Sequence, residues 1–130
     1  MTERATFFNS ENGDRIYNAD SMRQYISTFF TDGIHQGEFA PSFSSGMTIM
    51  VGAGYTVING DVRYFPNQTR VTLEIADALY GRIDTIVLEH NENTREITIK
   101  PIKGDYSETP EPKAPVRTGG IYQLVIAQIS

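Results

Sequence analysis

The sequence contains no cysteine and no tryptophan, and only two histidines among its 130 residues. The lack of cysteine excludes disulfides, thiolate nucleophiles and cysteine-ligated zinc or iron–sulfur sites. Apolar runs such as Ile86–Leu88 are far shorter than the roughly 20 residues that cross a bilayer, so we expect no membrane contact. The chain turns polar directly after Phe7 and Phe8, unlike a signal peptide, which predicts assembly in a cytoplasm.

No block of like charges is present either, although the formal net charge is −5. Lysine and arginine are scattered singly and are not interleaved with aromatic residues, so we expect no binding to nucleic acid. The length and the 39% hydrophobic content are those of one ordinary globular domain over residues 1–130.

One segment has clear helical periodicity. Five apolar residues fall at positions i, i+3, i+4, i+7 and i+8: Met22, Tyr25, Ile26, Phe29 and Phe30. Asn18 is a good N-cap, and Tyr17 before it is placed to pack on Met22. Asp32 and Gly33 supply the stop, which predicts an amphipathic helix over residues 18–32 in an N-terminal segment 1–45.

From residue 46 the apolar pattern changes to a period of two, which predicts antiparallel strands over 46–102. Asn59-Gly60 is a strong hairpin signal, and the glycines of 52–54 favour another hairpin turn or a bulge. Residues 71–75 alternate as a half-buried strand, and 83–89 with 95–102 form a second hairpin. The prolines and glycines of 103–120 favour a surface loop or a semi-rigid spacer, before a final strand in 121–130. Residues 76–82 read as a short connector.

These elements predict a mainly β protein, α+β by content. We expect a small antiparallel β-sandwich or partly open barrel with one N-terminal amphipathic helix. The helix stripe and Phe7-Phe8 are expected to be buried against the sheet or against a sister subunit.

Chemistry-bearing residues do not form a recognisable constellation. His35 and His90 lack metal-ligand spacing, and each is interpreted as a polar residue at a surface turn. Asp105, Glu108 and Glu111 could form a loose calcium site, but a solvated loop is the preferred interpretation. Arg82 and Asp84 are interpreted as a structural ion pair, worth little if exposed. We therefore predict no catalytic, cofactor-binding or metal-binding residue and no enzymatic activity.

Aromatic residues support an alternative function. Exposed rings stack on the pyranose rings of saccharides, so a carbohydrate-binding domain for host cell-wall saccharide remains open. The candidate rings are Tyr55, Tyr64, Phe65, Tyr106 and Tyr122. The lack of tryptophan argues against this alternative.

The opening segment 7–20, FFNSENGDRIYNAD, is similar to the start of a group of phage structural proteins. These are upper-baseplate and receptor-binding, tail-fibre-like proteins of phages and prophages of Gram-positive bacteria. The resemblance continues through residues 47–60 and through 81–88, GRIDTIVL, where Gly81 departs from the family's more usual polar residue. It ends in the strand that carries Tyr122, Leu124, Ala127 and Ile129.

The resemblance implies a non-catalytic N-terminal attachment module of the virion tail. Its implied partners are other tail or baseplate proteins and further copies of itself, with a trimer favoured, and a host saccharide through a missing C-terminal domain. A strand that runs to Ser130 favours a chain cut from a longer protein. The predicted interface residues are Phe7, Phe8, Tyr17, Met22, Tyr25, Ile26, Phe29 and Phe30.

Overall fold

The computed structural model describes residues 8–15, 17–75 and 79–130, and within these ranges the protein is mostly β. A single helix, α1 (Ala19–Phe29), precedes the strands that form the body of the molecule. The strands are β1 (Gly33–Ile34), β2 (Pro41–Ser45), β3 (Thr48–Val51), β4 (Gly54–Ile58), β5 (Asp61–Phe65), β6 (Thr69–Thr72), β7 (Asp84–Asn91), β8 (Glu96–Ile102) and β9 (Ile121–Ile129). The prediction of a mainly β protein with one N-terminal helix is confirmed.

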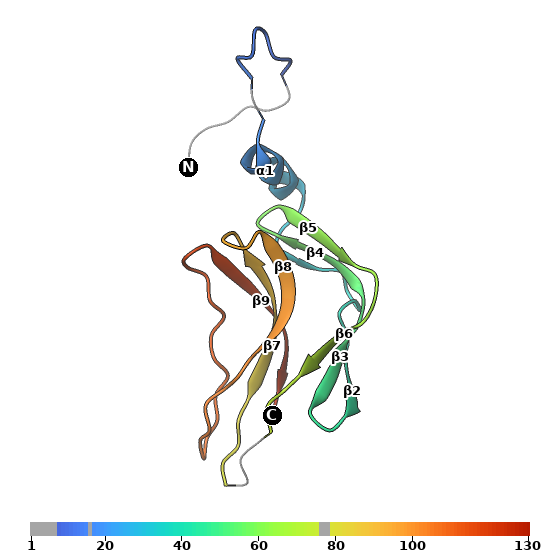
Figure 1. Cartoon of the computed structure of the whole chain (residues 1–130), viewed down its shortest axis with the longest axis vertical. Helices are drawn as coiled ribbons and strands as arrows, with labels where there is room; N and C mark the ends of the chain where they lie inside the picture. The colour runs from blue at the N-terminus through green and yellow to red at the C-terminus, as the bar shows by residue number, and fades with distance from the viewer. Residues whose placement is uncertain (1–7, 16, 76–78) are drawn as a thin grey trace.

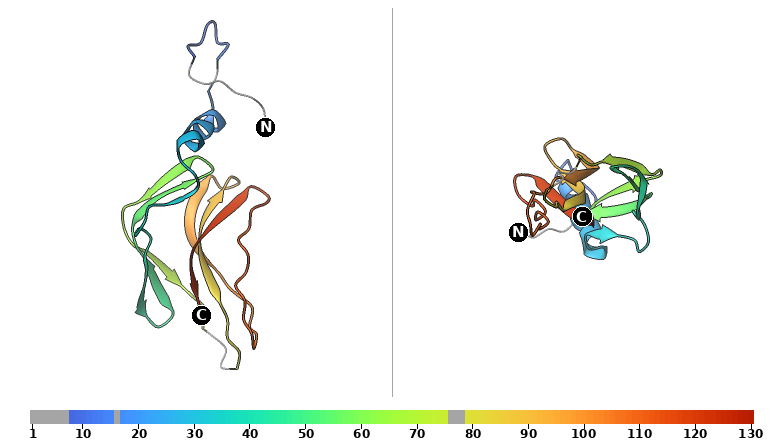
Figure 2. Two further views of the ribbon diagram at one scale, coloured as in Figure 1. Left: turned by 180° about the vertical axis from the view of Figure 1, so that it is seen from behind. Right: turned by 90° about the horizontal axis from the view of Figure 1, so that it is seen from below.

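The strands form three antiparallel sheets, with the orders β8-β7-β9, β1-β4-β5 and β2-β3-β6. The β8-β7-β9 sheet lies on one side of the molecule and the two smaller sheets lie on the other (Figure 1). The view from behind shows the same division (Figure 2). The helix stands at one end, beyond the β4–β5 hairpin, and none of the described sheets closes into a barrel.

One hydrophobic core contains residues of all three sheets. Its largest fully buried side chains are Phe39, Ile49, Ile58, Ile86 and Leu88. Strand β7 is the most buried element: seven of its eight residues are buried, and it pairs with β9 from Asp84 and with β8 from Thr85, in each case as far as Asn91. This continuous burial makes β7 the central strand around which the fold is built.

The start of α1 agrees with the sequence, and its end does not. Asn18 is the N-cap, and its side-chain oxygen accepts a hydrogen bond from the backbone N–H of Ser21 at 3.2 Å. The helix ends at Phe29 and Phe30 is extended, so the predicted stop at Asp32-Gly33 is wrong. Gly33 instead belongs to β1, and the Asp32 carboxylate accepts a hydrogen bond from the N–H of Asn59. No helix of the described residues is long and apolar enough to span a bilayer.

The hairpin predicted at Asn59-Gly60 and the hairpin predicted between residues 83–89 and 95–102 are confirmed. Asn59 and Gly60 have φ angles of 52° and 78° between β4 and β5, as a two-residue turn with two positive φ angles requires. Strands β7 and β8 pair across residues 91–96, and β9 covers the predicted final strand.

Three boundaries of the β region need correction. Strands β1 and β2 precede residue 46, within the segment assigned to the helix and its flanks. Residues 52–53 connect two sheets and form no hairpin turn, because β3 pairs with β2 and β6 and not with β4, which begins at Gly54. The strand predicted over 71–75 ends at Thr72, and Ile75 is 85% exposed. The predicted connector 76–82 lies partly outside the described residues.

The proline-rich segment 103–120 contains no named strand and is largely exposed, as the first of the two interpretations, a surface loop, predicts. It packs on the body, which does not fit the second interpretation, a spacer. The N–H of Gly104 donates to the buried Asp84, and the N–H of Ser107 donates to the carbonyl of Gly81. Near its other end, Val116 exchanges two hydrogen bonds with the backbone and side chain of Gln123 in β9. These bonds hold the segment against the β8-β7-β9 sheet.

A buried polar cluster lies on the same sheet. Glu89 is 4% exposed, and its carboxylate accepts hydrogen bonds from Lys100 at 2.7 Å and from Gln123 at 2.9 Å. Burial alone would raise the pKa of Glu89, but the bonds from Lys100 and Gln123 lower it below its ordinary value of 4.5.

We expect this cluster to make stability depend on pH. The folded-state pKa of Glu89 is lower than its unfolded value, so its contribution is present above about pH 4.5 and is lost as the pH falls through the folded pKa. Urea unfolding between pH 3 and pH 7 should therefore show a loss of stability on the acid side that is smaller in Glu89→Gln. An unchanged acid slope in that variant would contradict the assignment.

Candidate functional site

The candidate site is the apolar surface formed by one face of α1 and by Phe30, the residue just after the helix. We call it the helix stripe: Met22, Tyr25, Ile26, Phe29 and Phe30. Phe29 is 65% exposed, Phe30 58% and Met22 47%. Tyr25 is 45% exposed and its ring lies edge-on to Phe29 at 5.2 Å, while Ile26 is half-buried. The residues that the periodicity assigns to a buried face thus remain largely on the surface.

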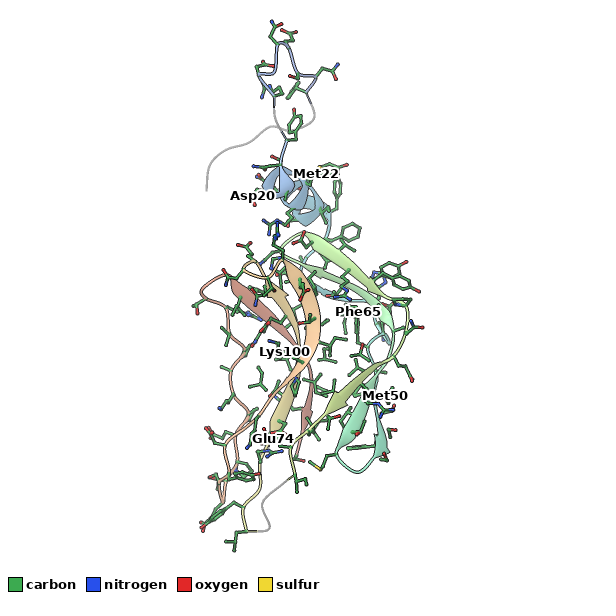
Figure 3. All side chains as sticks on the ribbon, in the orientation of Figure 1. Asp20, Met22, Met50, Phe65, Glu74 and Lys100 are labelled. Carbon is green, nitrogen blue, oxygen red and sulfur yellow. The ribbon has the colours of Figure 1, made fainter. Side chains whose placement is uncertain are left out.

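The helix contacts the body through its backbone at Arg23. A Cβ atom on Gly60, at the β4–β5 turn, would lie 2.1 Å from the Arg23 carbonyl oxygen and 2.8 Å from the Arg23 Cα. Glycine is therefore required for the turn to approach the helix this closely. In Figure 3 the helix sits on the end of this hairpin, with Asp20 and Met22 on different sides of it.

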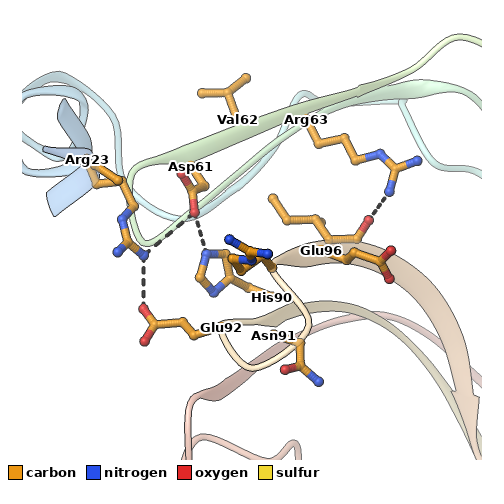
Figure 4. A pocket seen from close by; sticks show the side chains of 11 residues that line it. Arg23, Asp61, Val62, Arg63, His90, Asn91, Glu92 and Glu96 are labelled. Atoms are coloured by element: carbon orange, nitrogen blue, oxygen red, sulfur yellow. Dashed lines mark hydrogen bonds and ion pairs between the residues drawn. The ribbon is translucent and has the colours of Figure 1, made fainter.

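The Arg23 side chain clamps α1 to two other elements (Figure 4). Its guanidinium pairs with Asp20 at 2.6 Å, with Glu92 in the β7–β8 turn at 2.9 Å and with Asp61 in β5 at 3.7 Å. The hydrogen bond to Glu92 raises the pKa of Arg23 above its ordinary value, so the guanidinium stays charged. Because the charged side chain of Arg23 makes these contacts, α1 is held to the body while its apolar residues stay exposed.

His90 extends this clamp into the body, and its assignment to a surface turn is wrong. His90 is 4% exposed because it lies in the central strand β7. Its Nε2 is 2.5 Å from the Asp61 carboxylate. The other ring nitrogen, Nδ1, is buried and has no hydrogen-bond partner among the described residues. The contact between His90 and Asp61 therefore joins the central strand β7 to β5.

A cleft of about 640 Å³ lies between α1, β5 and the β7–β8 turn, and the clamp residues form part of its wall. The carboxylates of Asp61 and Glu92 face Arg23, and the Arg63 side chain donates to the carbonyl of Ile97. The described residues contain no group of three or more histidine and acidic side chains placed to hold a metal ion. The charged side chains of the cleft therefore pair with one another and join α1, β5 and the β7–β8 turn.

The other predicted interface residues lie before the helix. Phe8 is 59% exposed, and its backbone N–H and C=O both bond to the Tyr17 hydroxyl, at 2.6 and 2.8 Å. The guanidinium of Arg15 lies 5.4 Å from the centre of the Phe8 ring. Phe7 lies outside the described residues. The structure thus brings Phe8 and Tyr17 together next to the helix.

The five candidate saccharide-binding rings do not form one surface. Tyr55 and Tyr64 stack at 4.3 Å on the outer face of β4 and β5, about half exposed. Phe65 belongs to the core, and Tyr106 and Tyr122 lie beneath arginine side chains. Because Tyr55 and Tyr64 use one ring face each on the other, this pair is a poor platform for a pyranose.

Sequence reasoning did not identify the clamp. Arg23 and Glu92 are 69 residues apart, and no local spacing connects them. The one local signal is Asn59-Gly60, since a turn with no side chain at its second position is a place where another backbone can approach.

Comparison of the chain with family models, with curated proteins and with solved structures finds no match. The resemblance to phage tail proteins therefore remains a prediction. The evidence on function comes from the surfaces that the fold leaves exposed.

Proposed function

We propose that this chain is a non-catalytic attachment module of a phage or prophage tail that joins tail or baseplate proteins through the helix stripe. The observation that carries the proposal is an amphipathic helix whose apolar side stays exposed while Arg23 holds it to the body. Monomeric soluble proteins rarely leave large apolar patches uncovered, and such patches mark interaction sites. The tail assignment rests on the resemblance of residues 7–20 to phage baseplate and receptor-binding proteins.

The finer architecture belongs to the same proposal. We infer a small open β-sandwich, with the β8-β7-β9 sheet as one layer and the two smaller sheets as the other. The shared core, with Ile49 and Val71 from one side and Ile86 and Leu88 from the other, supports this arrangement. An experimental structure in which these two groups of residues do not meet would contradict it.

The test of the function is a binding measurement against the distal-tail and baseplate proteins encoded beside this chain. We expect Met22→Ser/Phe29→Ser to weaken binding about 30-fold or more, since two large apolar residues at an interface contribute roughly 2–4 kcal/mol. Biolayer interferometry with the purified chain gives the affinities.

The matched control is Phe43→Ser, which removes a ring that is 76% exposed but lies on β2, outside the helix stripe. We expect this variant to bind like the parent chain. If no tail or baseplate protein binds, the proposal fails. If cell-wall saccharides bind on a glycan array instead, the carbohydrate alternative replaces it.

A further inference from the structure

The tripeptide Asn-Gly-Asp occurs twice in the chain, starting at Asn12 and at Asn59. Both copies form the same kind of two-residue turn, with φ angles of 55° and 78° in the first and 52° and 78° in the second. The reactive groups and the local backbone are thus alike, while the surroundings differ. We infer that Asn12 is a site of spontaneous deamidation in the folded protein and that the fold protects Asn59 from the same reaction.

The reaction needs only the chain and water. The backbone nitrogen of the glycine attacks Cγ of the asparagine side chain and closes a five-membered succinimide ring. The side-chain amide nitrogen leaves as ammonia and takes the proton of the glycine nitrogen with it. Water then breaks either ring C–N bond and gives aspartate or isoaspartate, so one water is consumed, one ammonia is released and nothing is oxidised or reduced. Glycine favours the attack, because no Cβ shields its nitrogen.

Each turn has to open before this ring can close. Ring closure brings the asparagine Cβ and the next backbone nitrogen to the same side of the bond between Cα and the carbonyl carbon. The left-handed conformation of both asparagines holds these two atoms on opposite sides of that bond. The rate of deamidation at each site therefore depends on the free energy of opening its turn locally.

The described contacts of the turn at Asn12 are local. The N–H of Asp14 donates to the Glu11 carbonyl at 3.2 Å, and the N–H of Glu11 donates to the Asp14 carboxylate at 2.6 Å. Residues 8–15 are all exposed, and nothing lies within 4 Å of the Cβ position of Gly13. This segment stands beyond α1, away from the sheets (Figures 1 and 2). Opening the turn therefore breaks two hydrogen bonds and disturbs no strand.

The turn at Asn59 is held by distant parts of the chain. The N–H of Asn59 donates to the Asp32 carboxylate at 2.7 Å. A Cβ on Gly60 would overlap the carbonyl oxygen of Arg23, so the turn packs directly on the backbone of α1. The residues on either side of the turn pair across β4 and β5, and one of them, Ile58, is fully buried in the core. Opening this turn therefore disrupts the hairpin and its contact with the helix together.

Incubation of the purified chain in a mildly alkaline buffer tests the inference. Trypsin places the two sites in separate peptides, residues 5–15 and 24–63, and tandem mass spectrometry locates the conversion of amide to acid in each. We expect Asn12 to react at least about ten times faster than Asn59, because an exposed local turn opens far more often than a core hairpin. Samples taken before the incubation correct for conversion during digestion.

Incubation in concentrated urea is the control for the sequence, because both sites are then Asn-Gly-Asp in an unfolded chain. There the two rates should agree within about a factor of two. Asp32→Ala removes the hydrogen bond to the N–H of Asn59, so it should raise the rate at Asn59 and leave the rate at Asn12 unchanged. Circular dichroism checks that this variant is folded.

Equal rates at the two sites of the folded chain, a faster reaction at Asn59, or no conversion at Asn12 would overturn the inference. A difference that persists unchanged in urea would also overturn it, since the fold would not be its cause. The attachment function is a separate proposal, because deamidation involves no partner, and it stands or falls by its own binding measurement.

Discussion

Replacement of Arg82 by methionine is expected to lower the free energy of unfolding by about 3–5 kcal/mol, the cost of breaking a buried ion pair. The side chains of Arg82 and Asp84 are 3% and 5% exposed, and they pair through two bonds of 2.7 and 2.8 Å. The Arg82→Met variant leaves the Asp84 carboxylate buried without its cation. Urea unfolding at neutral pH measures the loss.

The cost is large because Arg82 also connects segments that the core does not reach. Its guanidinium donates to the Tyr106 hydroxyl at 2.7 Å and to the Glu74 carbonyl at 2.6 Å. The hydrogen bond to Asp84 raises the pKa of Arg82 above its ordinary value, so the cation is present at any pH at which the protein folds. The Arg82 side chain thus connects Glu74, which follows β6, to the start of β7 and to the proline-rich segment.

Two further variants separate the ion pair from its setting. Lys113→Met removes an exposed pair with Asp105 at 3.6 Å and should change stability by no more than about 0.5 kcal/mol. Arg82→Met/Asp84→Leu should be more stable than Arg82→Met alone, because no buried charge is left unpaired. If Arg82→Met and Lys113→Met lower the free energy of unfolding equally, the buried ion pair does not hold the proline-rich segment 103–120 to the body.

Local signals in the sequence predicted local structure. Asn18 caps α1 as its side chain and position require, and Asn59-Gly60 forms the turn that two positive φ angles demand. Both features depend on a few neighbouring residues, so they can be read without knowledge of the rest of the fold. The exposed stripe was likewise visible as a helical period, although periodicity alone does not tell which surface covers it.

The pairing of β3 and the burial of His90 were not predicted from the sequence, because both depend on contacts between distant segments. Residues 47–51 and 55–58 resemble the two arms of a hairpin. In the structure, however, β3 pairs with β6 (Thr69–Thr72), and β4 pairs with β5 in another sheet. The residues that follow His90 are typical of a turn, which suggested an exposed position. His90 is nevertheless buried, because it belongs to the central strand β7 and contacts Asp61. Pairing partners at this distance depend on how whole strands pack, which no local pattern records.

The same distinction between local and distant contacts leads to a prediction at Gly60. We expect Gly60→Ala to lower the free energy of unfolding by about 2–4 kcal/mol and to release α1 from the body. About 1 kcal/mol comes from placing alanine at a positive φ, here 78°, and the rest from overpacking against a backbone. The Cβ would lie 2.1 Å from the Arg23 carbonyl oxygen, and a backbone atom cannot rotate away as a flexible side chain can.

Gly119→Ala is the matched control, because Gly119 also has a positive φ, of 65°, but nothing lies within 4 Å of its Cβ position. This variant should cost only the backbone term, about 1 kcal/mol. Hydrogen exchange should show the α1 amides less protected in Gly60→Ala and unchanged in Gly119→Ala. Equal effects of the two variants on α1 would mean that the turn does not fix the helix, and the direction of its exposed stripe would then have to be set by the Arg23 ion pairs alone.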